Sequence, residues 1–349
     1  MRLSLFPYTP EVATLIRNRS ALKKYELHSI ISFKEDLERL EKLNQQTGIL
    51  CTDSIEAGLQ QTDELVLLPE NIKTRWQKYY DCIDYAVQNG ITIYGTSKLL
   101  DMIPEEKYKQ LIQLIENTSG AEQMIINPSL FDIDIPVIAV TGLGENCGKF
   151  ECELEVKQYI DSLGYQCMAL SSNPLGVYAG MELLPNFVFS DKIALHYKIF
   201  LFNRYIYARC REEKPDVLLI SIPGGVIQLS QNDRNFFFEI PIAISSAVHI
   251  DVTILTVYYA NAPLNFLDQI ANDCQKRFAM PIKSFYMARQ LATMEPGNDF
   301  MQFFSVSDEY IISHRDKIAS REDTAIPLED HSKVYQRLIH ILQNNLNTF

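Results

Sequence analysis

The first third of the chain alternates short apolar runs with longer segments whose apolar residues recur at helical spacing. The run Arg2–Phe6 predicts a strand, and Thr9-Pro10-Glu11 then supplies a cap, a proline suited to a first helical turn and an early acid, so a helix should follow to about Lys24. Further strands are predicted at Tyr25–Ser32, Gly48–Thr52, Glu64–Leu68 and Ile91–Tyr94, and further helices at Phe33–Leu43, Ser54–Gln61, Ile72–Gln88 and Pro104–Glu116. This alternation predicts a mostly parallel, Rossmann-like sheet. The segment has no GxGxxG fingerprint, so nothing specific predicts dinucleotide binding there.

A polar stretch between Asn117 and Pro136 interrupts this pattern, as expected where two domains meet. We therefore expect a Rossmann-like domain at residues 1–117, a linker at 118–136 and a second α/β domain at 137–349. Strands of the second domain are predicted at Val137–Thr141, Gln166–Ser171, Asp216–Ile222, Val252–Tyr258 and Ser284–Met287. Most of these runs are almost wholly apolar, which is typical of strands covered on both faces. A hairpin at Phe303–His314 and a C-terminal amphipathic helix complete the domain.

One segment carries recognisable chemistry. The strand that begins at Val137 runs into a glycine-rich turn that ends in Gly148-Lys149, directly before a segment with helical spacing. Backbone N–H groups of such a turn, together with a helix N-terminus, form a concave anion site, and a lysine there can reach a terminal phosphate. The ligand class is a nucleotide or another phosphate-containing molecule. Candidate binding residues, with a second glycine-containing loop included, are Gly142, Gly144, Asn146, Cys147, Gly148, Lys149, Gly224 and Gly225.

The spacing of this turn resembles the P-loop of dethiobiotin synthetase and cobyric acid synthase type proteins. Five residues separate Gly142 from Gly148, where the standard GxxxxGK[ST] motif has four. The strand DVLLISIPGG at Asp216–Gly225 also resembles the matching strand of those proteins, so the resemblance spans about 90 residues. It implies a P-loop NTPase-like α/β fold for the second domain. Phe150 stands where Ser or Thr would ligate Mg²⁺, and Ser221 stands where the strand-end acid would lie, so the usual Mg²⁺ ligands are missing.

Local charge also argues against nucleotide hydrolysis at this turn. Between Gly142 and Glu153 one lysine faces three glutamates, whereas a triphosphate favours a positive field. Three interpretations stay open: a plain strand-to-helix turn with a solvated Lys149, an altered but real nucleotide or phosphate site, and a site for another ligand. Three other predicted strand-end loops, at 171–176, 223–225 and 259–263, are also rich in Gly, Pro, Asn or Ser. Ligand loops at a parallel sheet edge have this composition, and so does any strand-to-helix loop that needs turn residues, so both interpretations stay open.

Composition narrows the function classes further. The chain has 349 residues, is 47% hydrophobic and carries a net charge of −12, so binding to nucleic acid or to an anionic membrane would need a basic patch that we do not find. No apolar stretch is long enough to span a membrane. The seven scattered cysteines lack CxxC pairs and favour reduced, buried thiols in a cytoplasmic protein, with Cys147 inert. The six histidines show no zinc-site spacing, so we expect no metal. Catalytic residues stay unassigned.

Taken together, the opening Leu5–Glu11, the turn-rich junction, the altered loop at Gly142–Lys149 and the strand 214–225 resemble one family. These are the peptide maturation system proteins of bacterial clusters that make ribosomally synthesised, post-translationally modified peptides. The chain also bears a more distant resemblance to two-domain proteins that join a Rossmann-like half to a P-loop half, some of which are amino-acid N-acyltransferases.

Two functions follow from these resemblances. One is an accessory protein that binds a precursor peptide or a maturation enzyme on a degenerate P-loop scaffold. The other is a nucleotide-dependent or acyl-transferring enzyme with its site between the two domains. Whether the chain is an enzyme, and whether it forms a homo-oligomer, stay open.

Overall fold

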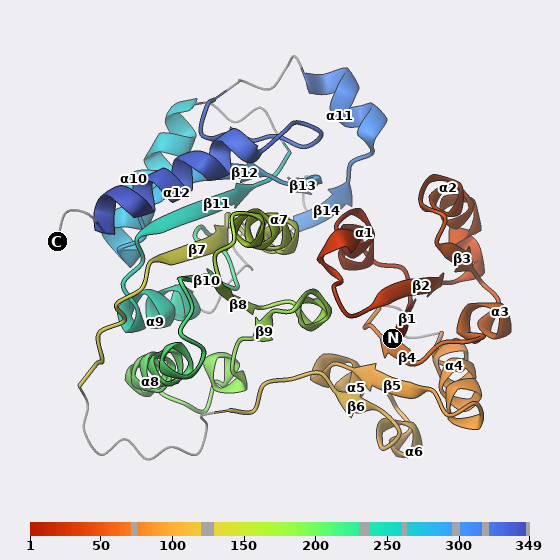
Figure 1. Cartoon of the computed structure of the whole chain (residues 1–349). Coiled ribbons are helices and arrows are strands. Elements are labelled where there is room, and N and C mark those ends of the chain that lie inside the picture. The colour runs from red at the N-terminus through yellow and green to blue at the C-terminus, as the bar shows by residue number, and fades with distance from the viewer. Residues whose placement is uncertain are drawn as a thin grey trace. The chain divides into compact units, whose positions relative to one another are not determined.

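The computed structural model describes residues 1–70, 75–119, 129–229, 238–259, 264–294, 301–315 and 321–346. These residues form two compact units, each built around a parallel sheet (Figure 1). Unit 1 comprises Met1–Glu116 with Pro174–Gly180, and unit 2 comprises Asn117–Asn173 with Met181–Phe349. The mixed α/β class with two parallel sheets, predicted from the apolar pattern, is confirmed.

Unit 1 has a six-stranded sheet in the order β3-β2-β1-β4-β5-β6. Its strands are β1 (Arg2–Phe6), β2 (Glu26–Ile31), β3 (Leu50–Thr52), β4 (Glu64–Leu67), β5 (Thr92–Gly95) and β6 (Gln113–Leu114). Its helices are α1 (Pro10–Arg17), α2 (Leu37–Thr47), α3 (Ile55–Leu59), α4 (Trp76–Gln88), α5 (Ser97–Met102) and α6 (Glu106–Lys109). All pairings are parallel, and the order reverses between β1 and β4, as in Rossmann-like sheets.

The start of α1 follows the predicted capping chemistry. Thr9 is the N-cap and its side chain accepts a hydrogen bond from the Val12 N–H, while Pro10 occupies the first helical turn. The prediction of one helix over Pro104–Glu116 is wrong, because α6 ends at Lys109 and Gln113–Leu114 adds an edge strand to β5. A two-residue edge strand has too little periodicity for the sequence pattern to reveal.

Unit 2 has a seven-stranded sheet in the order β15-β12-β11-β7-β10-β8-β9, all parallel. Its strands are β7 (Val137–Gly142), β8 (Cys167–Ser171), β9 (Glu182–Leu183), β10 (Val217–Ser221), β11 (Val252–Val257), β12 (Ile282–Met287) and β15 (Thr324–Ala325). Its helices are α7 (Lys149–Ser162), α8 (Leu195–Glu213), α9 (Glu239–Ala247), α10 (Leu264–Phe278), α11 (Asp308–His314) and α12 (Ser332–Leu346). The central strands β7, β10 and β11 are buried along their whole length, as the nearly continuous apolar runs predict.

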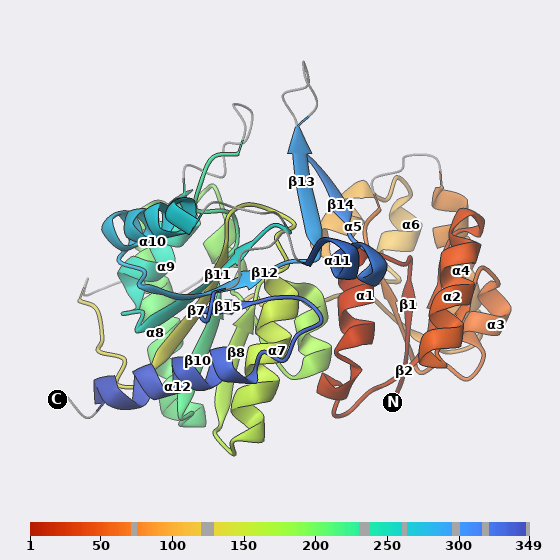
Figure 2. The same ribbon diagram turned by 90° about the horizontal axis from the view of Figure 1, so that it is seen from above.

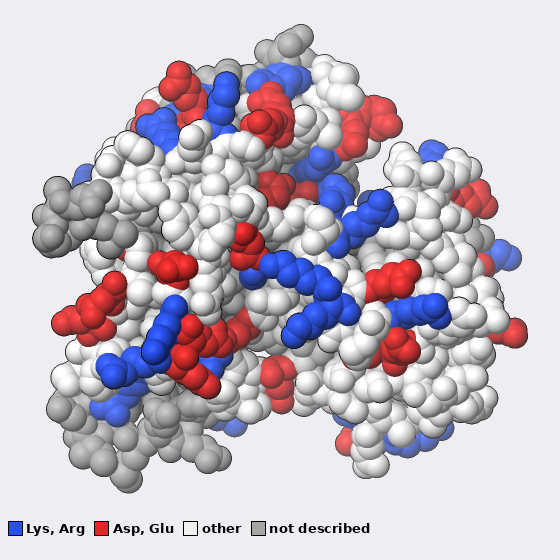
Figure 3. Space-filling view, viewed as in Figure 1, with Lys and Arg blue, Asp and Glu red and all other residues white. Residues whose placement is uncertain are grey.

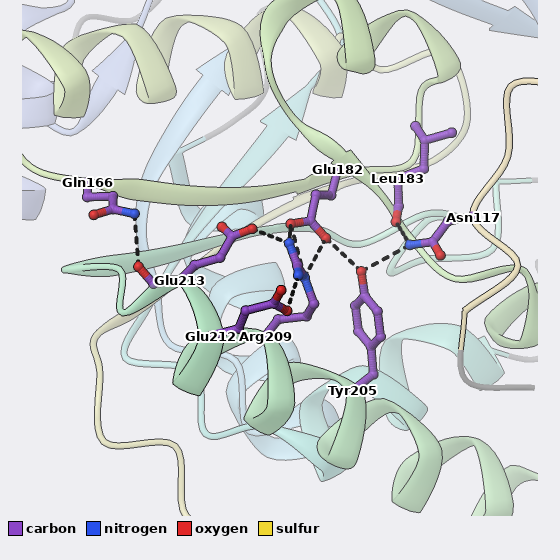
Figure 4. A network of polar contacts seen from close by, with 8 residues as sticks. All are labelled: Asn117, Gln166, Glu182, Leu183, Tyr205, Arg209, Glu212 and Glu213. Carbon is purple, nitrogen blue, oxygen red and sulfur yellow. Dashed lines mark hydrogen bonds and ion pairs between the residues drawn. The ribbon is translucent and has the colours of Figure 1, made fainter. Parts of the chain in front are cut away.

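The helices of unit 2 lie on both faces of its sheet (Figure 2). Helices α8, α9 and α10 supply side chains to the main core on one face, and α7 and α12 pack together on the other. A polar network around Arg209 of α8 joins that helix to β9 and to the segment that starts at Asn117 (Figure 4). Within it, Glu182 accepts from Arg209 and from the Tyr205 hydroxyl, and Asn117 donates to Tyr205.

The hairpin predicted at Phe303–His314 is wrong in its placement. Strand β14 (Met301–Ser305) pairs antiparallel with the earlier strand β13 (Gln290–Met294), and Asp308–His314 forms helix α11. Ser307 caps α11 by accepting from the Tyr310 N–H, and Asp308 and Glu309 lie in its first turn, where acids favour a helix. The capping serine and the two acids, rather than the apolar residues, therefore favour a helix at Asp308–His314.

Candidate functional site

The glycine-rich turn connects β7, the central strand of the unit 2 sheet, to α7. Gly148 has a φ of 69° and immediately precedes Lys149, the first residue of α7. Asn146, which is exposed, also has a positive φ, of 50°. Such backbone angles favour Gly and Asn, which accounts for these residue types in the turn. The strand, turn and helix thus have the arrangement of a P-loop.

The second glycine loop lies directly against this turn. The N–H of Val226 donates to Gly142 O at 3.0 Å, and a Cβ atom on Gly225 would lie 2.5 Å from Leu143 O. A Cβ on Gly144 would lie 2.3 Å from Leu229 Cδ1 and 2.7 Å from the hydroxyl of Tyr258. The glycines at 144 and 225 therefore allow protein atoms to fill the space beside the turn. Residues Gly224–Leu229 are called the covering segment below.

Lys149 is bound by main-chain carbonyl groups. Its ammonium donates to Gly144 O at 3.3 Å and to Gly224 O at 3.1 Å. Burial lowers the pKa of the Lys149 ammonium, and the nearby Cys147, Glu153 and Glu145 oppose that shift. Lys149 is half-buried, and the covering segment supplies one of the two carbonyls that its ammonium contacts, so solvent does not fully surround the ammonium.

Cys147 points inward and does not have a reactive environment. Its thiol donates to Thr256 O at 3.2 Å, and the side chain is buried. Burial raises the pKa of Cys147 to about 11, although the charge of Lys149 and two backbone N–H groups of the turn favour the thiolate. The side chain is therefore a neutral thiol near pH 7.

The buried carboxylate of Glu153, which the sequence motif does not indicate, lies below the turn. Glu153 is one helical turn beyond Lys149, is 1% exposed and accepts hydrogen bonds from the hydroxyls of Ser171 and Ser221. These serines end β8 and β10, which pair in parallel, and Ser172 shares a further hydroxyl contact with Ser221 at 2.9 Å. Burial raises the pKa of Glu153, whereas the two serines and Lys149 lower it. In the sequence, only the four-residue spacing of Lys149 and Glu153 indicates that the two side chains share one face of the helix.

The structure shows which of the charged side chains around the turn face solvent. Glu151 is buried and its Oε1 lies 3.7 Å from Nε of Arg289, a residue just beyond β12. Glu153 is bound by two serines, so of the three glutamates in the turn and first helical turns only Glu145 is exposed. The local negative balance is thus mostly held inside the protein and does not face solvent.

The conventional Mg²⁺ ligands are absent from this site. Phe150 is buried in the position after Lys149, and the Ser221 hydroxyl is bound to Glu153. Within the residues that the structure describes, no group of three His, Cys, Asp or Glu side chains could hold a metal ion.

The eight predicted binding residues are close in space, with two loops contributing. Gly142 to Lys149 form the turn, while Gly224 and Gly225 contact it through the Lys149 ammonium and the Gly144 backbone. Residues 260–263 of the predicted loop at 259–263 lie outside the described residues.

No protein-family model matches the chain, and no curated protein matches it. Among solved structures, a DUF1611 family protein from Anabaena variabilis has a TM-score of 0.54 at 13% identity, with 82% of this chain and 87% of that chain covered. The fold is shared. The 54 kDa signal recognition particle protein of Aeropyrum pernix, solved with GDP, has a TM-score of 0.33 at 14% identity and covers 78% of this chain and 60% of that one. In the described part of the chain, no helix has the length and apolarity needed to cross a membrane.

Proposed function

We propose that this chain is an accessory protein in the maturation of a ribosomally synthesised, post-translationally modified peptide. It binds the precursor peptide or a maturation enzyme, and its P-loop-like unit is a scaffold that does not hydrolyse nucleotide. The absence of hydrolysis is inferred from the contacts of Lys149 in the glycine-rich turn. Lys149, which would contact phosphate in an active P-loop, donates instead to Gly144 O and Gly224 O.

The missing metal ligands support the same proposal. Phosphoryl transfer in P-loop proteins depends on a loop Ser or Thr and a strand-end acid that together hold Mg²⁺. Phe150 has no oxygen to offer, and the hydroxyl of Ser221 already donates to Glu153. Nucleotide hydrolysis would therefore require several changes at this turn.

The charge of the protein supports a basic peptide as the partner. A net charge of −12 attracts a Lys- or Arg-rich chain over long range. On the face shown in Figure 3, acidic and basic side chains are interspersed, so the attraction is a property of the summed charge. The identity of the process comes from the family resemblance of the sequence, and the gene neighbourhood would test it directly.

The binding part of the proposal is testable with a labelled peptide. A fluorescent 20-residue Lys-rich peptide should bind, and its affinity should fall about tenfold between 50 and 300 mM NaCl, because salt screens the attraction. The same peptide with Glu in place of Lys is the matched control and should not bind. Lys149→Ala should leave the affinity unchanged. A salt-independent affinity, or equal binding of the Glu-rich control, would contradict the proposal.

The alternative function is a nucleotide-dependent or acyl-transferring enzyme. The position of Lys149 at the start of α7, with five glycines among the predicted binding residues around it, favours this alternative. Thermal unfolding of the protein with ATP, GTP, ADP or acyl-CoA, with and without Mg²⁺, separates the two functions. A ligand-induced increase in the unfolding temperature that Lys149→Ala removes would favour the enzyme.

A further inference from the structure

His331 lies between two hydrogen-bond acceptors at the start of α12. Its Nδ1 is 2.6 Å from Oε2 of Glu155, and its Nε2 is 2.8 Å from the carbonyl oxygen of Ile326. Glu155 belongs to α7, while Ile326 follows β15. One imidazole ring thus joins three parts of unit 2.

The two acceptors determine the protonation state of the ring. A neutral imidazole carries one N–H donor and one lone pair, so it can satisfy only one of these acceptors. The carbonyl of Ile326 cannot donate, and Glu155 also accepts from the hydroxyls of Tyr335, at 2.7 Å, and Tyr286, at 2.8 Å. Each oxygen of the carboxylate therefore already receives a tyrosine donor, which favours the ionised carboxylate. This geometry favours the imidazolium form of His331.

The surrounding charges are consistent with this state. Groups that face His331 are Glu155 and Glu151 of α7, Tyr286 of β12, and Asp330 and Tyr335 beside it in the chain. Burial lowers the pKa of His331, but the hydrogen bond and charge of Glu155 outweigh burial and raise it above 6.5. Burial likewise raises the pKa of Glu155, and donors from His331, Tyr335 and Tyr286 outweigh it and lower the pKa. A cation at a helix N-terminus opposes the helix dipole, so Glu155 is needed to hold it there.

We propose that His331 is a proton-dependent clasp that holds the start of α12 against α7. Loss of its proton leaves two acceptors facing each other, either at Glu155 or at Ile326, and weakens the docking of α12. Because the folded-state pKa is raised, the stabilisation is complete below the ordinary value of 6.5 and is lost as the pH rises through the folded-state pKa. The lowered pKa of Glu155 makes its contribution disappear only in acid, as the pH falls below 4.5 and through the folded-state pKa.

The test measures the histidine and the helix separately in the full-length protein. NMR titration of ¹³C-labelled histidine, with His331→Asn identifying the resonance, should give His331 a pKa above 6.5. Hydrogen exchange of the α12 amides, corrected for the intrinsic pH dependence, should lose about tenfold in protection for each pH unit between 6.5 and that pKa, and should level off above it. His331→Asn should abolish this pH dependence. Glu155→Gln should lower the pKa of His331.

His340→Asn is the matched control, because His340 is an exposed histidine on the same helix. In the His340→Asn variant, the protection of the α12 amides from hydrogen exchange should depend on pH as it does in the unsubstituted protein. A pKa of His331 at or below 6.5 would overturn the proposal, and so would α12 protection that stays constant up to pH 9. If His331→Asn does not fold, sequential assignment of the resonance in the unsubstituted protein keeps the titration decisive.

Discussion

At the scale of single residues, Gly225 shows how closely the covering segment approaches the turn. A Cβ atom there would lie 2.5 Å from both the Gly144 Cα and the Leu143 carbonyl oxygen, and neither backbone atom can move easily. Gly225→Ala should therefore lower the free energy of unfolding by about 1–3 kcal/mol, as measured by urea denaturation. Gly164→Asn is the control, since its site is open and Asn tolerates a positive φ. Equal losses in both variants would show that the turn and the covering segment are not in contact.

Glu153 provides a second prediction at this scale. Ser221→Ala removes one of its two serine donors and leaves a buried carboxylate oxygen without that partner, which should cost about 1–3 kcal/mol of unfolding free energy. Ser313→Ala, at an exposed site, should cost much less. If the two substitutions had equal effects in urea denaturation, Glu153 would not depend on Ser221.

The Glu153 arrangement also shows what the sequence could and could not predict. The order of strand, glycine turn and lysine was readable from residues 137–149, because each step has its own local chemistry. The contacts of Glu153 with Ser171 and Ser221 join residues that are far apart in the chain, and their proximity depends on the pairing of β8 with β10. Counting charges along the sequence could not show that Glu151 and Glu153 are buried.

At the scale of secondary-structure elements, α1 begins at the cap that the sequence predicted, whereas α11 begins at a serine cap inside the segment predicted as a hairpin. Thr9 and Ser307 mark the starts of α1 and α11. Helix α7 differs, because its buried residues include Glu151, Glu153 and Lys157 and lie on several sides of the helix. Helix α7 therefore has no single apolar face. Polar contacts with other parts of unit 2 cover its remaining faces.

Asn203 tests the attachment of the segment before β7 to α8. Its side chain accepts from the Phe131 N–H and donates to the carbonyls of Phe131 and Ala247. Asn203→Ala should lower the free energy of unfolding by about 2–4 kcal/mol, because the buried carbonyl of Ala247 and the part-buried main chain of Phe131 lose their partner. Asn344→Ala, at an exposed site of α12, is the control and should change it by less than about 0.5 kcal/mol. Similar small effects of both substitutions would contradict the attachment.

At the scale of the whole molecule, the alternating apolar pattern predicted the α/β class and the Rossmann-like sheet, and the glycine-rich turn with the strand at Asp216–Gly225 predicted the P-loop-like one. The division of the sequence at residues 118–136 stays a prediction, and residues 120–128 of it lie outside the described ones. The hairpin was misplaced because its two strands are Gln290–Met294 and Met301–Ser305, while Asp308–His314, the second half of the predicted range, forms helix α11.

The central claim is that the P-loop-like turn is occupied by the protein itself and does not hydrolyse nucleotide. The most direct measurement is phosphate release from ATP and GTP with Mg²⁺ by the purified protein and by Lys149→Ala, with an established P-loop ATPase as the positive control. We predict no release above the protein-free background for either protein. Hydrolysis by the unsubstituted protein that Lys149→Ala abolishes would contradict the claim.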